Sequence, residues 1–400
     1  MGASGGQYFT AGGAVPFVLD YRAGERREAT TQDAIERIRL IDALNNIDSI
    51  ETSPGIWPLD VPAYLRDVYV SMLTFENTEK HYGLETVGPS EAHEYCIRMA
   101  EIVAGGEDEL RKYPIIHASA EPVGPLLWDE HALRNMWLYA KHGLLVDIAC
   151  TSVAGLTSPT TLIGTIVHGN AGFLSGLVAA QLINPKTPVG RIFSGATTDL
   201  RTGKVVMGSV EYSLMEIVSG QLGQYYGLPS MGLGGIPDTN SLDVQTGYET
   251  ALTMMLVALG GVNRIQNGGL LATATMSSLV KMVIDDEIIG MVKYALRGIS
   301  VTKEKVPLDV IHELGPRGNF MGNIKALEFT RKHLRTEHYI PSISLRMDWD
   351  LWDKMRRKTV VDLAHEKVET ILKTHEPEPL PAGVRKQLEL IYEEAKKSLA

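Results

Sequence analysis

Residues 234–249, GGIPDTNSLDVQTGYE, decide the fold of this 400-residue chain. A short apolar run, Leu228–Leu233, leads into the two glycines, and an apolar helical segment, Ala251–Leu259, follows the polar residues. An apolar strand, a polar loop and a helix in this order are typical of parallel α/β proteins, which bind ligands at the carboxyl ends of their strands. The stretch therefore indicates both a fold class and a location for the site.

The same order of strand, loop and helix recurs along most of the chain at intervals of roughly 30–40 residues, which is the spacing of βα units. The expected strands are Ile47–Glu51, His81–Thr86, Pro114–Ser119, Leu144–Cys150, Val189–Ser194, Leu228–Leu233, Gly261–Gln266 and Gly298–Val301. These units predict an α/β protein, a (β/α)8 TIM barrel. An open doubly wound sheet is the alternative, but no GxGxxG motif opens a helix after the first strand.

Segments at both ends fall outside this repeat. Residues 1–45 are expected to pack on the barrel as a β-hairpin, formed by Tyr8–Thr10 and Val15–Tyr21, followed by a helix. The catalytic barrel is expected over residues 46–304. Residues 305–400 are charged and helical in pattern, and predict a C-terminal helical extension that packs outside or over the barrel.

Composition and charge exclude several classes of protein. The net charge of −10 argues against nucleic-acid binding, because phosphate contacts need clustered Lys and Arg. Two cysteines, Cys96 and Cys150, form no disulfide framework and indicate a reducing compartment. No apolar run is expected to reach the length needed to span a bilayer, and the Gly-rich start lacks the pattern of a signal peptide. We therefore expect a cytoplasmic protein that binds neither nucleic acid nor membrane.

The expected strand ends carry an acidic set of side chains without a dense set of cations. Such a mouth suits a cation or a neutral polar ligand better than a phosphate. No HxH or HxxxH pair is present, so no metal site is expected. Cys150, His117 and an acidic residue remain an alternative set of metal ligands, without a regular spacing in the sequence. The candidate positions at the strand ends are Glu51, Glu85, His117, Ser119, Glu121, Asp147, Cys150, Thr151, Phe193, Ser194, Asp238, Asn240, Asn263 and Gln266.

Several polar positions also have a structural interpretation. Cys150 is expected to be a small buried residue rather than a nucleophile. Asp243 is expected to cap the helix that follows it, and Glu211 sits where a carboxylate complements a helix dipole. His117 follows two isoleucines, so it fits a site at a strand end as well as a bond to a backbone carbonyl.

Several separated motifs of the chain resemble the trimethylamine:corrinoid methyltransferase family. They are TSPTTLIGTIVHGNAGFLSGLVAAQLINP (157–185), TDLRTGKVVMGSVE (198–211), QLGQYYGLPSMGLGGIPDTNSLDVQTGYE (221–249), GGLL, and IDDEI (284–288). The resemblance begins close to Gln7 and extends to the C-terminus. It implies a barrel enzyme that transfers a substrate methyl group to the cobalt of a separate corrinoid protein, and it favours a homo-oligomer.

No position is written as pyrrolysine, the residue that marks the trimethylamine-specific members of that family. The chain therefore resembles the branch without pyrrolysine, whose members demethylate quaternary amines such as glycine betaine. A quaternary ammonium leaves as a neutral amine, so the protein chiefly needs to hold the methyl group in line with Co(I). The resemblance thus implies no tightly bound cofactor and no metal, with cobalamin on the partner protein as the methyl acceptor.

The resemblance also implies roles for residues near the barrel mouth. Glu211, Asp238 and Gln266 are expected to line the substrate pocket, with Glu51, His117 and Phe193 as second choices and Arg201 or His117 meeting a substrate carboxylate. Asn240 and Asp243 are expected to fix the loop geometry beneath them. Many members of the family that this chain resembles carry a His near the position of Gln266. This difference implies that the ligand here differs from glycine betaine or is held differently.

Two other functions remain open from the sequence. A zinc-dependent corrinoid methyltransferase acting on methanol or a methylamine would need a cluster of His, Cys and acidic residues. A non-catalytic barrel would bind a small amine, or its corrinoid partner, without turnover. The sequence does not name the amine.

Overall fold

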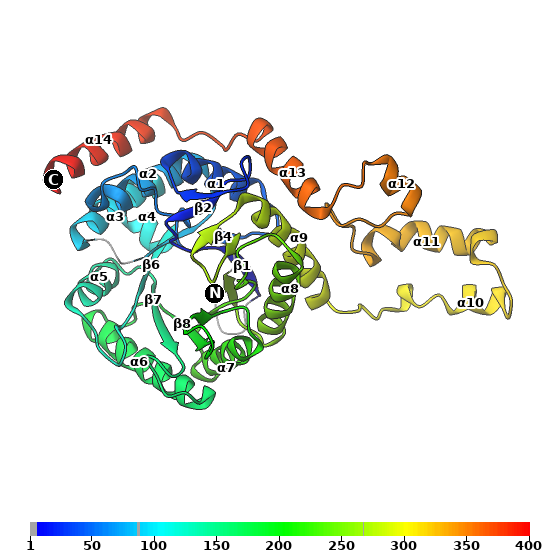
Figure 1. The fold of residues 1–400 in the computed structure, drawn as a ribbon, viewed down its shortest axis with the longest axis horizontal. Coiled ribbons are helices and arrows are strands. Elements are labelled where there is room, and N and C mark those ends of the chain that lie inside the picture. Colours follow the sequence, from blue (N-terminus) through cyan, green and yellow to red (C-terminus); the bar gives the residue numbers. More distant parts are fainter. Residues whose placement is uncertain (1–5, 86–88, 267) are drawn as a thin grey trace.

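In the computed structural model, which describes residues 6–85, 89–266 and 268–400, parallel strands close into a barrel surrounded by helices (Figure 1). Around the barrel the order is β1, β4, β5, β6, β7, β8, β10 and β11, and parallel pairing of β10 with β8 and of β11 with β1 completes the circle. A closed parallel barrel with helices outside is a TIM barrel, so the expected fold class is confirmed.

The barrel strands are short at the start of the chain and longer in its middle. They are β1 (Tyr8–Ala11), β4 (Ser49–Ile50), β5 (Tyr82–Glu85), β6 (Ile116–Ala120), β7 (Val146–Val153), β8 (Val189–Thr198), β10 (Ser230–Leu233) and β11 (Arg264–Gln266). The strand β9 (Val205–Val206) pairs antiparallel with the end of β8. A small second sheet contains β2 (Phe17–Leu19), β3 (Arg26–Glu28), β12 (Leu270–Leu271) and β13 (Met276–Ser277).

Helices cover the outside of the barrel. They are α1 (Thr31–Ala43), α2 (Arg66–Asn77), α3 (Ser90–Ala104), α4 (Glu107–Lys112), α5 (Glu130–Lys141), α6 (Leu162–Ile183), α7 (Val210–Tyr226), α8 (Val244–Leu259) and α9 (Leu279–Leu296). The C-terminal extension is helical, as expected, with α10 (Leu308–Leu314), α11 (Ile324–Glu337), α12 (Trp349–Lys354), α13 (Val360–Thr374) and α14 (Ala382–Ser398). Single 3-10 turns occur at Ala63–Leu65 (η1), Lys303–Lys305 (η2) and Phe320–Gly322 (η3).

The N-terminal strand differs from its sequence-based expectation. Tyr8–Ala11 is a barrel strand, paired parallel to β11 and β4, and is not one arm of a hairpin. The N-terminal hairpin exists, but β2 and β3 form it. The expected eighth strand at Gly298–Val301 was wrong, because β1 already closes the barrel and Ile299 is 91% exposed. Of the expected strand His81–Thr86, the end at Thr86 lies outside the described residues.

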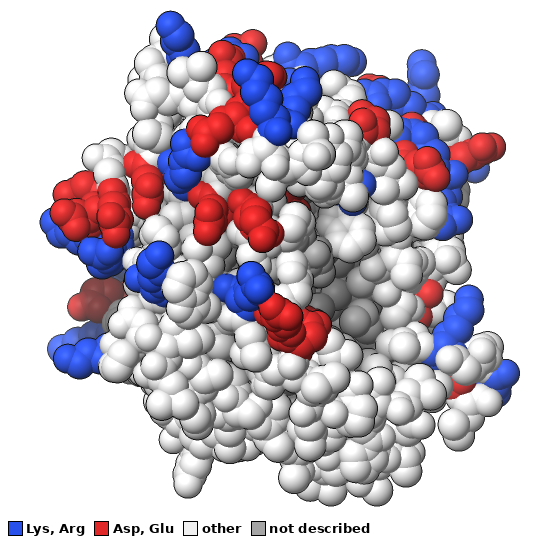
Figure 2. Space-filling view, turned by 90° about the vertical axis from the view of Figure 1, so that its left-hand side faces the viewer, with Lys and Arg blue, Asp and Glu red and all other residues white. Residues whose placement is uncertain are grey.

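The helix α6 corrects a second expectation. Leu162–Ile183 is long and apolar enough, by length and composition, to cross a membrane. In the structure this helix packs against β7 and β8, although only 33% of its most apolar window is buried. It contains no Lys, Arg, Asp or Glu, and the lower part of Figure 2, at the height of α6 in Figure 1, shows few charges.

Side chains alternate between the barrel interior and the helix layer along each strand. On β8, Gly190 faces the interior, since a Cβ placed there would lie 1.8 Å from Oδ1 of Asp147. The odd-numbered neighbours face outward, because Arg191 donates to the carbonyl of Ser219 on α7 at 3.0 Å. This alternation decides which residues share the interior.

Candidate functional site

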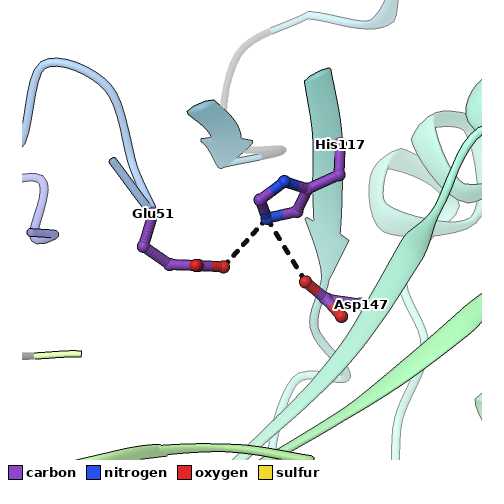
Figure 3. A group of neighbouring side chains, drawn as sticks. All are labelled: Glu51, His117 and Asp147. Atoms are coloured by element: carbon purple, nitrogen blue, oxygen red, sulfur yellow. Dashed lines mark hydrogen bonds and ion pairs between the residues drawn. The ribbon is translucent and has the colours of Figure 1, made fainter. Parts of the chain in front are cut away.

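A buried cluster of charged side chains crosses the barrel interior (Figure 3). Glu51 follows β4, His117 lies on β6 and Asp147 on β7, and each is at most 5% exposed. Nε2 of His117 lies 2.9 Å from Oε1 of Glu51 and 3.3 Å from Oδ2 of Asp147. Arg264, at the start of β11, contacts the carboxylate of Asp147 and lies 3.2 Å from Oε1 of Glu51. We call these four residues the interior cluster.

Two glycines on barrel strands leave room for the interior cluster. A Cβ at Gly83 on β5 would lie 2.6 Å from Nε2 of His117 and 2.0 Å from the carbonyl oxygen of Glu51. A Cβ at Gly190 would meet Oδ1 of Asp147 at 1.8 Å. Real Cβ atoms do not approach other atoms so closely, so the cluster depends on glycine at both positions.

His81, the residue before β5, fixes the orientation of His117. Its Nε2 lies 2.7 Å from Nδ1 of His117, and the backbone of Pro114 accepts a hydrogen bond from the His81 ring. Burial, and then the neighbouring His117, lower the pKa of His81 to about 3, so the His81 ring is neutral. The His81 nitrogen that faces His117 therefore accepts a hydrogen bond from Nδ1 of His117, and Nε2 of His117 is left facing the carboxylates.

The charges of the interior cluster support one another. Burial alone would raise the pKa of Glu51, but Arg264 and then His117 outweigh burial and hold this pKa at about 2. The Glu51 carboxylate is therefore ionised at any physiological pH. Among the described residues, no group forms a hydrogen bond with its buried Oε2, so the carboxylate keeps one oxygen for another cation.

The interior cluster contains donors that suit a divalent metal ion. One donor atom each from Glu51, His117 and Asp147 lies within 4.8 Å of the others. Arg264 competes for this place, because its guanidinium already contacts both carboxylates. The donors thus fit a metal ion only if the Arg264 guanidinium moves away from the two carboxylates, and the expectation of no metal stays a prediction.

A cavity of about 840 Å³ lies at the end of the barrel where the strands begin, opposite their carboxyl ends. Its wall contains residues at the amino ends of the strands, such as Tyr8, Val189 and Ser230. His81 and Arg264 also line it. Because TIM-barrel enzymes bind their substrates at the carboxyl ends of the strands, we do not assign this cavity to the substrate.

Gln266 takes the interior position above the cluster. It ends β11, two residues after Arg264, and is buried. A Cβ at Gly12 would lie 2.0 Å from its Nε2, so the amide rests against the turn after β1. Of the residues expected to line the pocket, Gln266, Glu51 and His117 are the ones that the structure places in the barrel interior.

Asp238 joins two loops at the carboxyl ends of the strands. Oδ1 of Asp238 accepts from the backbone N–H of Met207 at 2.9 Å, and Oδ2 accepts from that of Gly208 at 3.0 Å. The hydroxyl of Thr273 donates to Oδ1 at 2.9 Å. Both carboxylate oxygens are thus used within the protein.

The neighbours of Asp238 have different environments. Asp243 caps α8 by accepting from the backbone N–H of Thr246 at 3.1 Å, as the sequence indicates. Its Oδ2 accepts from the hydroxyl of Ser241 at 2.6 Å, which fixes the turn before the helix. Asn240 is exposed in the same turn.

Phe193, Arg201 and Glu211 lie outside the barrel interior. Phe193 is buried on the outer side of β8, where its ring packs against Gly169 of α6. Arg201 forms an ion pair with Asp199 at 2.7 Å in the turn after β8, with its side chain 88% exposed. Glu211 is exposed in the first turn of α7. The structure does not bring these three residues to the interior cluster.

Buried charges on the outer helices hold further loops at the carboxyl face. Arg37 of α1 donates to the backbone carbonyls of Gly12 at 2.9 Å and of Pro54 at 2.8 Å, which follow β1 and β4. Lys281 of α9 forms an ion pair with Asp285 at 2.6 Å and donates to the carbonyl of the loop after β10. These buried hydrogen bonds fix the loops that surround the barrel mouth.

Sequence reasoning missed Arg264 and His81, and it did not select Asp147 from the strand ends. Arg264 shares the face of Gln266, because side chains two positions apart on a strand point the same way. That alternation, applied backwards from Gln266, would have found Arg264. Nothing in the sequence around His81 distinguishes it from a residue that merely begins a strand.

The chain forms a TIM barrel with ionised side chains in its interior and fixed loops at the carboxyl ends of its strands. These features are typical of one class of protein, the TIM-barrel enzymes. Residues 3–400 match the model of the trimethylamine methyltransferase (MTTB) family, and the chain belongs to this family. It is therefore a methyltransferase, which confirms the family resemblance seen in the sequence.

Curated relatives of the chain agree with this family. A glycine betaine methyltransferase of Desulfitobacterium hafniense (strain Y51) is 32% identical over 95% of this chain and 78% of the relative. The trimethylamine methyltransferase MttB of Methanosarcina barkeri (strain Fusaro / DSM 804) is 33% identical over 93% of this chain and 74% of the relative. Among solved structures, the Methanosarcina barkeri monomethylamine methyltransferase (MtmB) superposes with a TM-score of 0.50 at 12% identity. This superposition covers 98% of this chain and 72% of that one, and it supports the fold alone.

Proposed function

We propose that this enzyme transfers a methyl group from a quaternary amine, of the type of glycine betaine, to the Co(I) centre of a separate corrinoid protein. The observation that carries the proposal is the 32% identity with a glycine betaine methyltransferase over 95% of the chain. A sequence without pyrrolysine favours a quaternary amine over trimethylamine. Cobalamin is then the partner's cofactor, and none is held tightly by this chain.

The interior cluster supports a cationic substrate. Glu51 is ionised, and its buried Oε2 has no hydrogen-bond partner in the part of the chain that the structure describes. A quaternary ammonium has no N–H to donate, so it is attracted to a carboxylate through charge alone. Because Gln266 faces the interior above the cluster, we assign to it a contact with the polar end of the substrate. Asp238, which was also expected to line the pocket, instead holds the loops around the barrel mouth.

The chemistry of the step asks little of the protein beyond positioning. The corrinoid supplies a strong nucleophile, which takes the methyl group while the C–N electron pair stays on the departing neutral amine. The residues of this chain bind the substrate, hold its methyl group in line and exclude water. No side chain has to donate or accept a proton in that step.

The proposal also includes the compartment in which the enzyme acts and the partners that it binds. Both cysteines are free and buried, which agrees with a cytoplasmic protein. A cognate corrinoid protein and a small methylated amine are its partners, and we assign it no nucleic-acid or membrane partner. We further propose that Arg201 and Glu211, exposed at the carboxyl face, contribute to a surface that the corrinoid protein approaches.

Methylation of a Co(I) corrinoid protein tests this function. The purified enzyme is mixed with a corrinoid protein already shown to accept methyl groups, and a panel of quaternary and tertiary amines is followed by the visible spectrum. We expect methyl-Co(III) with a quaternary amine and a reduced rate for Gln266→Ala. Methylation by tertiary amines alone, or by no amine in the panel, contradicts the proposal.

A zinc-dependent corrinoid methyltransferase is the second candidate. It is favoured by one observation, the three potential donors Glu51, His117 and Asp147. Zinc in a one-to-one ratio with the protein, required for methyl transfer, would favour this candidate over the first.

A further inference from the structure

The positive charges of the interior cluster are already directed at its own carboxylates. Glu51 and Asp147 share the guanidinium of Arg264. Nε2 of His117 faces the same two carboxylates, as Figure 3 shows, and its Nδ1 is bonded to His81. A carboxylate of a ligand would therefore have to compete with Glu51 and Asp147 for the same donors.

Other Lys and Arg side chains at the carboxyl face are bonded within the protein or exposed. The buried and half-buried ones donate to backbone carbonyls of the loops, and they are Arg37, Arg66 and Lys281. The exposed ones lie on turns and short strands further out, and they are Arg22, Arg26, Arg27, Arg201 and Lys204. Residues 86–88 and 267, which the structure does not describe, contain no Lys, Arg or His. Among the described residues, Arg264 is thus the one Lys or Arg that we place in the barrel interior.

A neutral hydroxyl lies beside Glu51 and Gln266. Thr10 on β1 is in register with Gln266 on β11, and the next residue of β1 accepts a hydrogen bond from the backbone N–H of Glu51 at 2.6 Å. The side chain of Thr10 faces the barrel interior, because Gly12, two residues later, faces the side chain of Gln266. Thr10 is fully buried, and its Oγ1 has no hydrogen-bond partner in the described part of the chain. A buried hydroxyl without a partner is unfavourable, so it is available to a polar group of a ligand.

Apolar side chains form another part of the interior. Ala149, Ile192 and Met231 make a buried cluster that joins β7, β8 and β10. Sδ of Met231 lies 3.4 Å from the guanidinium of Arg264, so this apolar cluster adjoins the charged one. Apolar walls suit N-methyl groups, while the charge of Glu51 attracts the ammonium that carries them.

We propose that the substrate is a quaternary ammonium alcohol, a cation with a hydroxyl where glycine betaine has a carboxylate. This inference rests on the proposed function and narrows its substrate class. Glu51 attracts the ammonium group, and Thr10 and Gln266 bind the hydroxyl, which both donates and accepts hydrogen bonds. A carboxylate in the same place would lie near the carboxylates of Glu51 and Asp147 without a cation of its own, and like charges repel.

The methyl transfer also favours a substrate without a carboxylate. When Co(I) takes the methyl group, the C–N electron pair stays on nitrogen, and the ammonium becomes a neutral tertiary amine. A quaternary ammonium alcohol thus gives a neutral amino alcohol. Glycine betaine would instead give an anion beside Glu51, because its carboxylate loses the neighbouring positive charge.

Binding in the absence of the corrinoid protein tests the substrate class separately from catalysis. Calorimetric titration of the full protein compares choline with glycine betaine, which share a trimethylammonium end and differ in the hydroxyl and the carboxylate. We expect choline to bind at least about tenfold more tightly, and to methylate the Co(I) corrinoid protein with a correspondingly higher kcat/KM. Glycine betaine that binds and reacts as well as choline overturns this inference and leaves the proposed function intact. A protein that demethylates no quaternary amine overturns both.

Thr10→Val tests the contact with the hydroxyl. Valine has nearly the shape of threonine, and Oγ1 of Thr10 makes no hydrogen bond among the described residues, so we expect the variant to fold. It should bind choline about tenfold more weakly and bind tetramethylammonium, which has no hydroxyl, as well as the wild type does. Thr250→Val is the matched control, because Thr250 on α8 is also fully buried with an unpartnered hydroxyl among the described contacts, and it should change neither affinity. An unchanged affinity of Thr10→Val for choline, or an equal loss for both ligands, overturns the inference.

Discussion

Oε1 of Glu51 lies 2.9 Å from Nε2 of His117, although 66 residues separate them in the sequence. The two side chains come from β6 and from the end of β4, and they meet across β5 because Gly83 carries no side chain. Ionisable side chains in the middle of this TIM barrel take the place of the apolar layers that usually fill such a core. The pair therefore couples the stability of the barrel to its ionisation.

The substitution Glu51→Gln should remove a stabilising charge and its dependence on pH. Breaking a buried charge pair by removing one partner costs about 3–5 kcal/mol of the free energy of unfolding. The folded-state pKa of Glu51 is about 2, below its ordinary value of 4.5. Its contribution is thus fully present above pH 4.5 and is lost as the pH falls towards 2. Urea unfolding at pH 5 and pH 3 should show this loss in the wild type and a flatter dependence in Glu51→Gln.

Glu216→Gln provides the control for that measurement. Glu216 is equally buried, but burial raises its pKa well above the ordinary value, so it does not stabilise the fold as an anion. This variant should keep the wild-type loss of stability between pH 4.5 and 2. An equal loss in Glu51→Gln and Glu216→Gln would show that Glu51 is not the group responsible.

Gly83→Ala should destabilise the protein by disturbing the interior cluster. The new methyl group would overlap the backbone oxygen of Glu51 and the ring of His117, so the strand or the ring must move. Overpacking of this kind costs about 3 kcal/mol of the free energy of unfolding. Gly247→Ala is the matched control, because it lies in α8 with no atom within 4 Å of the new Cβ. It should raise the stability by up to about 1 kcal/mol. Chemical denaturation of both variants measures these free energies of unfolding. A Gly83→Ala variant that is more stable than Gly247→Ala would contradict our interpretation.

The sequence predicted the barrel well because each βα unit repeats a local pattern. It placed β1 wrongly, since a four-residue strand before a Gly-rich turn has the same local pattern as half a hairpin. Only pairing with β11, more than 250 residues away, makes Tyr8–Ala11 a barrel strand. With Tyr8–Ala11 in the barrel, the eight strands are complete without Gly298–Val301.

The site was predictable only in part for a similar reason. Glu51, His117 and Gln266 were identified because they follow apolar runs, and these are interior positions in the structure. Phe193 also lies in an apolar run. Because successive side chains on a strand point to opposite faces, its ring faces α6 and not the barrel interior. Arg264 was missed because its role depends on carboxylates from β4 and β7, which only the closed barrel brings together.

Chelation should leave the enzyme unchanged. Arg264 already contacts Glu51 and Asp147, and Nε2 of His117 lies 2.9 Å from the first carboxylate and 3.3 Å from the second, so the two carboxylates are held in place without a divalent ion. We expect elemental analysis to find less than stoichiometric zinc, and the melting temperature to stay the same after treatment with EDTA. One zinc ion per chain, absent from His117→Ala, would instead show that the cluster is a metal site.

Asp238→Ala should loosen two loops at the barrel mouth without unfolding the barrel. The carboxylate accepts from the backbone N–H groups of Met207 and Gly208, which precede α7, and from the Thr273 hydroxyl after β12. Without these bonds, the amides of Met207 and Gly208 should exchange with solvent at least tenfold faster, which corresponds to about 1.4 kcal/mol of local stability. Hydrogen exchange measured by mass spectrometry on peptides covering the start of α7 would detect the change.

Asp243→Ala separates this effect from a general loss of loop structure. Asp243 caps α8 and makes no hydrogen bond to Met207 or Gly208 among the described contacts, so only amides at the start of α8 should exchange faster. Methyl transfer adds a second readout, since a carboxylate that merely positions loops should raise KM and lower kcat together. If Asp238→Ala raised KM for the amine without faster exchange at Met207 and Gly208, Asp238 would contact the substrate directly. The hydrogen bonds to both of its oxygens argue for the loops instead, because they leave the carboxylate little freedom to turn towards a ligand.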